Sequence, residues 1–203
     1  MPLRPALPGS FAASPPPPEP AWAHASGWAQ LSGARQTVSC VLPCRDRAHA
    51  LPQLLPLLSD TLTECGYPWE LIVVDFGSRD GTDSLMSAWG ELPGFRYLST
   101  DGPVALEEAF ETGILAARGD AVILLDPALP HTPELIPQMI LQWESEARLV
   151  YAARDAGGAS RLLRWDEALA AAQTARPDMH LPPECMQLSL LDRRLVDWLV
   201  QAG

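Results

Sequence analysis

Trp69-Glu-Leu-Ile-Val-Val-Asp-Phe-Gly-Ser-Arg-Asp-Gly-Thr82 is the stretch of sequence from which the fold can be predicted. Its apolar run, Leu71 to Val74, is short and rich in β-branched residues, which is typical of a strand buried on both faces. The run ends at Asp75, and a glycine-containing turn then leads into a helical pattern. A carboxylate at the carboxyl end of a parallel strand points into the crevice where open α/β sheets bind ligands.

A second apolar run, Ala121 to Leu125, ends in the same way at Asp126. Strand and helix patterns alternate between and around these two runs, and such alternation predicts a mostly parallel sheet between helices. The predicted fold class is therefore α/β, a Rossmann-like nucleotide-binding domain. We expect Asp75 and Asp126 to face one shared pocket at the carboxyl edge of its sheet.

Size and charge limit the class of partner. The chain has 203 residues and a formal net charge of −11, with 47% hydrophobic residues. A nucleic-acid partner is disfavoured, because phosphate backbones are held by clustered Lys and Arg. No apolar run approaches the ~20 residues that span a bilayer, and the first residues lack the apolar core of an export signal. We therefore expect a cytoplasmic protein without a transmembrane segment.

The chain divides into two parts by composition. Residues 1–36 are rich in Pro and Ala, which predicts a disordered tail because such a segment buries too little apolar surface to offset its ordering entropy. Residues 37–203 form the predicted domain. The four cysteines lack the paired spacing of a zinc site and are expected to be reduced thiols.

Hydrophobic periodicity and turn residues predict the remaining elements, with Pro43 closing the first strand. Strands are expected over 37–42, 71–74, 95–99, 121–125 and 148–152, and helices over 48–66, 81–89, 104–118, from 133 onward, 161–175 and 192–200.

Four motifs in this order resemble the family-two inverting glycosyltransferases of the GT-A fold, including the dolichyl- and polyprenyl-phosphate mannosyl- or glucosyltransferases. They are Val38-Ser-Cys-Val-Leu-Pro-Cys-Arg-Asp-Arg47, the Leu71–Thr82 stretch, Gly113-Ile-Leu-Ala-Ala-Arg-Gly-Asp120 and Leu125-Asp-Pro-Ala-Leu-Pro-His-Thr-Pro-Glu-Leu-Ile-Pro137. The segment between Arg154 and Gln187 is shorter in this chain than the corresponding segment of the family.

The resemblance implies a UDP- or GDP-linked sugar as donor and an acceptor such as a polyprenyl phosphate. It also implies Mg²⁺ or Mn²⁺, held by an Asp-x-Asp pair and by the phosphates. By resemblance, the nucleotide-binding residues are Pro43, Asp46, Asp75, Gly77 and Ser78, and the metal ligands are Asp126 and His131.

Each of these residues also has a simpler interpretation. Asp75 either contacts the base or caps the turn that follows it. Asp126 is either a metal ligand or a turn residue. His131 and Glu134 either complete a metal site or lie at the surface, where Glu134 favours the positive end of a helix.

The chain departs from the family at the acidic positions. Phe76 and Ala128 stand where relatives have the second acids of their two motifs, while Gln187 and Ser189 stand at the acceptor-side Asp and Arg. Two hypotheses follow, and whether the chain is an enzyme stays open between them. One is a glycosyltransferase whose metal site has a single acid. The other is a catalytically degenerate binding or regulatory module with a protein partner and no cofactor.

Overall fold

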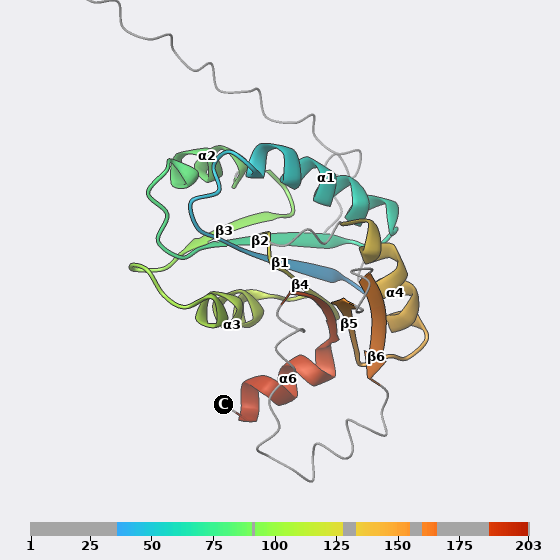
Figure 1. Ribbon diagram of the computed structural model, residues 1–203. Helices are drawn as coiled ribbons and strands as arrows, with labels where there is room; N and C mark the ends of the chain where they lie inside the picture. Colours follow the sequence, from blue (N-terminus) through green and yellow to red (C-terminus); the bar gives the residue numbers. More distant parts are fainter. Residues whose placement is uncertain (1–35, 91, 128–132, 155–159, 166–186, 203) are drawn as a thin grey trace, which may run out of the picture.

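The computed structural model describes residues 36–90, 92–127, 133–154, 160–165 and 187–202 (Figure 1). The strands are β1 (Val38–Cys44), β2 (Trp69–Asp75), β3 (Phe95–Ser99), β4 (Ala121–Leu125), β5 (Leu149–Arg154), β6 (Ser160–Trp165) and β7 (Leu188–Asp192). The helices are α1 (Leu51–Glu64), α2 (Thr82–Trp89), α3 (Leu106–Ala116), the 3₁₀ turn η1 (Pro133–Leu135), α4 (Ile136–Glu144) and α6 (Arg193–Ala202).

The strands form one seven-stranded sheet in the order β3-β2-β1-β4-β7-β5-β6. The first four strands in this order are parallel, which confirms the predicted parallel core. The other half adds antiparallel pairs, because β7 runs opposite to both β4 and β5 and β6 runs opposite to β5. The sheet is therefore mixed, with its parallel part carrying both predicted aspartates.

Helices cover both faces of the sheet. In Figure 1, α1 and α2 lie above the sheet and α3 and α6 lie below it. The alternating side chains of β2 explain the two layers: Leu71 and Val73 pack into the cluster that includes α1, α2 and α4, and Ile72 and Val74 pack into the cluster with α3 and α6. Leu71 to Val74 are at most 1% exposed, so the predicted burial on both faces is confirmed.

Helix α3 lies unusually close to the sheet at Gly113. A Cβ atom added there would meet Val41 Cγ1 at 2.2 Å, so only glycine fits without moving the helix. This close approach places the loop after α3 against the starts of β1 and β2.

Two element predictions are wrong. Pro43 does not close the first strand but lies inside β1, opposite Val74 of β2. The register of β1 with β4 ends at Val41, so Pro43 has one partner strand and its missing N–H is tolerated. The predicted helix over 161–175 is contradicted in its first part, because residues 161–165 belong to β6 and pair with β5. Its remainder lies outside the described residues.

Among the helices that the structure describes, none has the length and apolar character needed to cross a membrane. The predicted tail over residues 1–36 lies almost wholly outside the described part of the chain.

Candidate functional site

Both predicted aspartates lie at the carboxyl edge of the parallel strands. Asp75 is the last residue of β2, opposite Cys44 of β1, and Asp126 directly follows β4. Strand β1 lies between β2 and β4, so the two backbone positions are separated laterally by two strand spacings, roughly 10 Å. The shared edge is confirmed, and a ligand that contacts both residues must span the end of β1.

Asp75 is held in a fixed orientation. Its side chain is buried, at 3% exposure, and its Oδ1 accepts a hydrogen bond from the Ser78 backbone N–H at 2.9 Å. Gly77 makes the turn possible, because it has a φ of 97° and a Cβ there would lie 2.8 Å from the Pro103 Cα. Asp75 therefore does cap its turn. Contact with a base stays a prediction.

The loop after β1 is bonded to the loop after β2. The Asp46 N–H donates to Ser78 Oγ at 2.8 Å, and the Arg79 N–H donates back to Asp46 Oδ1 at 2.7 Å. Asp46 adopts a positive φ of 53°, which aspartate tolerates better than most residues. A second contact runs from the Ala48 N–H to Asp80 Oδ2 at 2.9 Å. These bonds bring Asp46 and Ser78 together beside Asp75.

Contact of Pro43 with a nucleotide stays a prediction. Pro43 is a buried residue within β1, one position before Cys44. The structure therefore offers its backbone, at the end of the strand, rather than its ring for contact with a ligand.

Tyr97 is a site residue that sequence reasoning missed. Its hydroxyl lies 3.1 Å from Asp75 Oδ2 and 3.1 Å from Asp83 Oδ1. Burial and the Asp75 carboxylate raise the pKa of Tyr97, so its hydroxyl stays protonated and donates. The pairing of β3 with β2 is the signal that could have identified it. Tyr97 of β3 lies opposite Val73 of β2, and Ser99, two residues further along β3, lies opposite Asp75.

Asp126 lies beside Gln187. The Asp126 N–H donates to the Gln187 carbonyl oxygen at 2.9 Å, because β7 runs antiparallel to β4 and starts where β4 ends. The predicted acceptor-side position and the predicted metal ligand are therefore neighbours. His131 and Ala128 lie outside the described residues, and within the described part of the chain no three His, Cys, Asp or Glu side chains gather to hold a metal.

The donor set nevertheless fits a magnesium-type ion. Mg²⁺ is commonly bound by one or two carboxylates together with substrate phosphates and water, rather than by a full protein cage. Asp126 is half-buried at the carboxyl edge and supplies one such carboxylate.

Two further family positions are occupied by residues that point into the protein. Phe76 is partly buried and packs against the cluster below the sheet. Ser189 is fully buried in β7, and its hydroxyl has no hydrogen-bond partner within the residues described here. Neither side chain supplies the charge that relatives are expected to have at these positions.

The two buried cysteines of β1 are expected to be unreactive. Burial raises the pKa of Cys40 and of Cys44 to about 12, with the Asp75 carboxylate adding to the effect at Cys44. At pH 8 only about 10⁻⁴ of either thiol is then the nucleophilic thiolate. Native protein treated with iodoacetamide at this pH should carry no label on Cys40 or Cys44 by peptide mass spectrometry, whereas denatured protein should be labelled at both. Rapid native labelling of Cys44 would contradict the described burial.

Comparison with known proteins places these features in a family. A family model described as "Glycosyl transferase family 2" matches residues 39–192. An undecaprenyl-phosphate 4-deoxy-4-formamido-L-arabinose transferase of Pseudomonas fluorescens is 30% identical over 143 residues, which is 66% of this chain and 40% of that protein. An uncharacterized glycosyltransferase of Synechocystis is 27% identical over 167 residues, covering 81% of this chain and 52% of the relative. The chain thus spans about two-fifths to one-half of these relatives.

Solved structures agree on the fold. Glucosyl-3-phosphoglycerate synthase of Mycobacterium tuberculosis, solved with Mn²⁺, UDP and phosphoglyceric acid, superposes with a TM-score of 0.54 at 22% identity, covering 79% of this chain and 57% of that one. The mannosyltransferase PcManGT of Pyrobaculum calidifontis, solved with GDP-Man and Mn²⁺, gives 0.51 at 19% identity, with coverage of 82% and 47%. The predicted GT-A fold is confirmed.

Proposed function

The chain belongs to glycosyl transferase family 2, and from this premise we propose that its carboxyl edge binds the nucleoside diphosphate of a UDP- or GDP-linked sugar for transfer to a polyprenyl phosphate. The observation that carries the proposal is the bonded pair of loops after β1 and β2, which fixes Asp75 beside Asp46 and Ser78. A preorganised edge of this kind lowers the ordering cost of binding a ligand.

Each residue has a distinct role in this proposal. The Asp75 carboxylate accepts a hydrogen bond from the base, while Gly77 and Ser78 lie where backbone and hydroxyl groups reach the nucleoside. Asp126 is the residue that would hold Mg²⁺ or Mn²⁺. Bound there, the ion would supply positive charge to offset the charge of a leaving diphosphate.

The chemistry at Gln187, the acceptor-side position by resemblance, supports one acceptor class. A neutral amide cannot take a proton, so this position cannot serve as the general base that a hydroxyl acceptor needs. A phosphate monoester has a second pKa near 6 and is already anionic at neutral pH, so its oxygen attacks without a base. This supports a polyprenyl phosphate, the class named in the curated relatives. Under this proposal no residue of the chain is assigned as a catalytic base. The cytoplasmic location remains a prediction.

A second candidate function is favoured by Phe76 and Ser189. Phe76 packs against the cluster below the sheet, and Ser189 is fully buried in β7. A chain that has lost these charges would keep the fold as a binding or regulatory module for a protein partner. Such a module would bind nucleotide weakly and would transfer no sugar.

Thermal unfolding with nucleotide and metal tests the first candidate. UDP or GDP is expected to raise the melting temperature by several degrees in the presence of Mn²⁺, because a ligand that binds only the folded state stabilises it by mass action. Asp126→Asn should remove the dependence on Mn²⁺. Asp101→Asn, in the loop after β3 and three strands from β4 in the sheet order, should keep it. Ala128→Asp, which restores the second acid, should increase the shift.

A transfer assay then separates the two candidates. With undecaprenyl phosphate and a labelled UDP- or GDP-sugar, an active transferase forms a lipid-linked product. Nucleotide binding without any product would favour the module. No stabilisation by either nucleotide, with or without Mn²⁺, would contradict the proposed donor site.

A further inference from the structure

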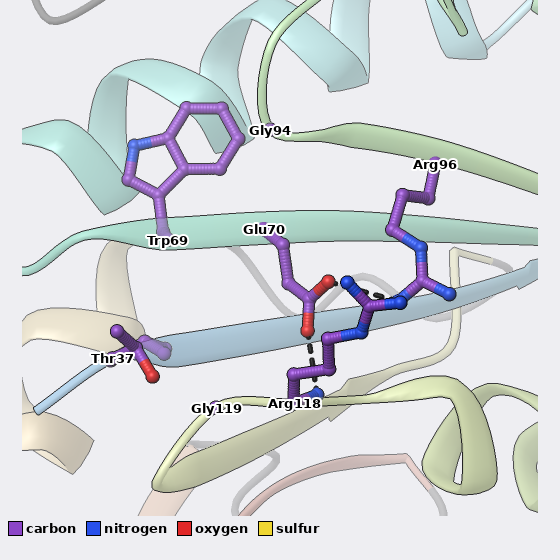
Figure 2. Close-up of a pocket in the computed structure, with 8 residues that line it drawn as sticks. Thr37, Trp69, Glu70, Gly94, Arg96, Arg118 and Gly119 are labelled. Carbon is purple, nitrogen blue, oxygen red and sulfur yellow. Dashed lines mark hydrogen bonds and ion pairs between the residues drawn. The ribbon is translucent and has the colours of Figure 1, made fainter. Parts of the chain in front are cut away.

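A cavity of about 350 Å³ opens at the amino edge of the same strands, opposite the edge that carries Asp75 (Figure 2). Its walls come from the starts of β1 and β2, from β3 and from the loop before β4. The residues that matter for its chemistry are Thr37, Glu70, Arg96, Arg118 and Gly119.

The one carboxylate that lines the cavity is already bonded through both of its oxygens. Glu70 Oε1 accepts hydrogen bonds from Ser39 Oγ and from the Arg118 backbone N–H, both at 2.7 Å. Glu70 Oε2 forms an ion pair with Arg96 Nη1 at 3.0 Å. Glu70 therefore carries one negative charge against the positive charges of Arg96 and Arg118.

The Arg118 guanidinium is the uncompensated charge. No hydrogen bond or ion pair joins its side chain to the residues described in this structure. Figure 2 shows it extending from the loop before β4 into the space where the side chains of Glu70 and Arg96 lie. Arg96 uses Nη1 for Glu70 and for the Ala116 carbonyl oxygen at 2.6 Å, which leaves its Nε and Nη2 free of described partners. Two guanidinium groups thus face one carboxylate.

The loop that carries Arg118 is rigidly attached. The Gly119 N–H donates to Ser39 Oγ at 2.8 Å, and Asp120 Oδ2 accepts from the Thr37 N–H at 2.7 Å. Arg193 donates to the Ala117 and Gly119 carbonyl oxygens at 2.9 and 2.6 Å. Arg193 itself pairs with Asp197 at 3.7 Å. Among the lining residues, Glu70 offsets one of the two guanidinium charges, so the cavity keeps one net positive charge in a chain of formal charge −11.

We propose that this cavity binds a small organic phosphate, held by the Arg118 guanidinium together with the free nitrogens of Arg96. Guanidinium groups bind phosphate oxygens through paired, charge-assisted hydrogen bonds, and two of them match its several oxygens. The volume leaves room for a few carbon atoms beyond the phosphate. The site lies at the opposite ends of the strands from the proposed donor site and does not depend on it.

Inorganic phosphate and glycerol 3-phosphate serve as probes for the full chain, with chloride at matched ionic strength as the reference. Both probes should raise the melting temperature in a saturable manner, and isothermal titration should give the affinity. Arg118→Gln is expected to weaken binding about tenfold or more, the usual effect of losing a charge-assisted hydrogen bond. Arg161→Gln, which removes an equal charge from the exposed edge strand β6, should bind as the wild type does.

Three outcomes would overturn the proposal. One is an equal effect of chloride, which would mean that the change in melting temperature reflects ionic strength alone. Another is unchanged phosphate affinity in Arg118→Gln. The third is displacement of glycerol 3-phosphate by UDP with Mn²⁺, which would place the phosphate at the carboxyl edge. The proposed donor site would survive the first two outcomes, so failure of one site can be distinguished from failure of the other.

Discussion

Replacing Glu70 with alanine is expected to lower the free energy of unfolding by about 2–4 kcal/mol, because three donors lose their common acceptor. Ser39 is fully buried and its hydroxyl donates to Glu70, as does the Arg118 backbone N–H. Arg96 would also lose its ion pair, although its bond to the Ala116 carbonyl oxygen remains. Urea denaturation, read as the change in midpoint at constant slope, measures this loss.

Matched variants separate the network from simple loss of charge. Asp101→Ala removes the same charge from an exposed loop residue and should change stability by less than about 0.5 kcal/mol. Glu70→Gln keeps one carbonyl acceptor and should fall between the two. If Glu70→Ala were no more destabilising than Asp101→Ala, the described hydrogen bonds at the amino edge would contribute nothing to the fold.

The parallel half of the sheet could be predicted because its signals are local. The run from Leu71 to Val74 is apolar at every position, as a strand covered on both faces must be, and the aspartates directly follow such runs. The resemblance of the motifs then predicted the GT-A fold, and in the structure the loops after β1 and β2 bring Asp46 and Ser78 together. Hydrophobic periodicity reports the pattern of burial along a single segment.

The rest depends on contacts between distant segments. Residues 161–165 show no strict alternation and contain good helix formers, yet they pair with β5 as an edge strand. Glu70, Arg96 and Arg118 belong to three separate elements, at sequence separations of 26 and 48 residues for the two bonds to Glu70. The sequence offered one signal for that cavity, which is the presence of polar residues near the starts of otherwise apolar strands. Only the parallel pairing of these strands brings the polar residues together.

Replacing Asp75 with alanine is expected to cost about 1–3 kcal/mol of stability even without ligand, because the partly buried Ser78 N–H would lose its acceptor. The Tyr97 hydroxyl also lies within hydrogen-bond distance of this carboxylate, which is 3% exposed. Tyr97→Phe removes a single hydroxyl and should cost about 1 kcal/mol. Denaturant midpoints of the single and double variants give the coupling energy between the two residues.

The coupling energy shows which of two carboxylates accepts the hydrogen bond from the Tyr97 hydroxyl. Asp75 and Asp83 lie at the same 3.1 Å from its oxygen, and a phenol donates to only one of them at a time. The pKa of Tyr97 is raised above its ordinary value of 10.0, so the folded state favours the protonated phenol. This stabilisation is complete below pH 10 and is lost as the pH rises through the higher folded-state value. A coupling near zero with Asp75, matched by a large one with Asp83, would assign the proton to Asp83 and free Asp75 Oδ2 for a base.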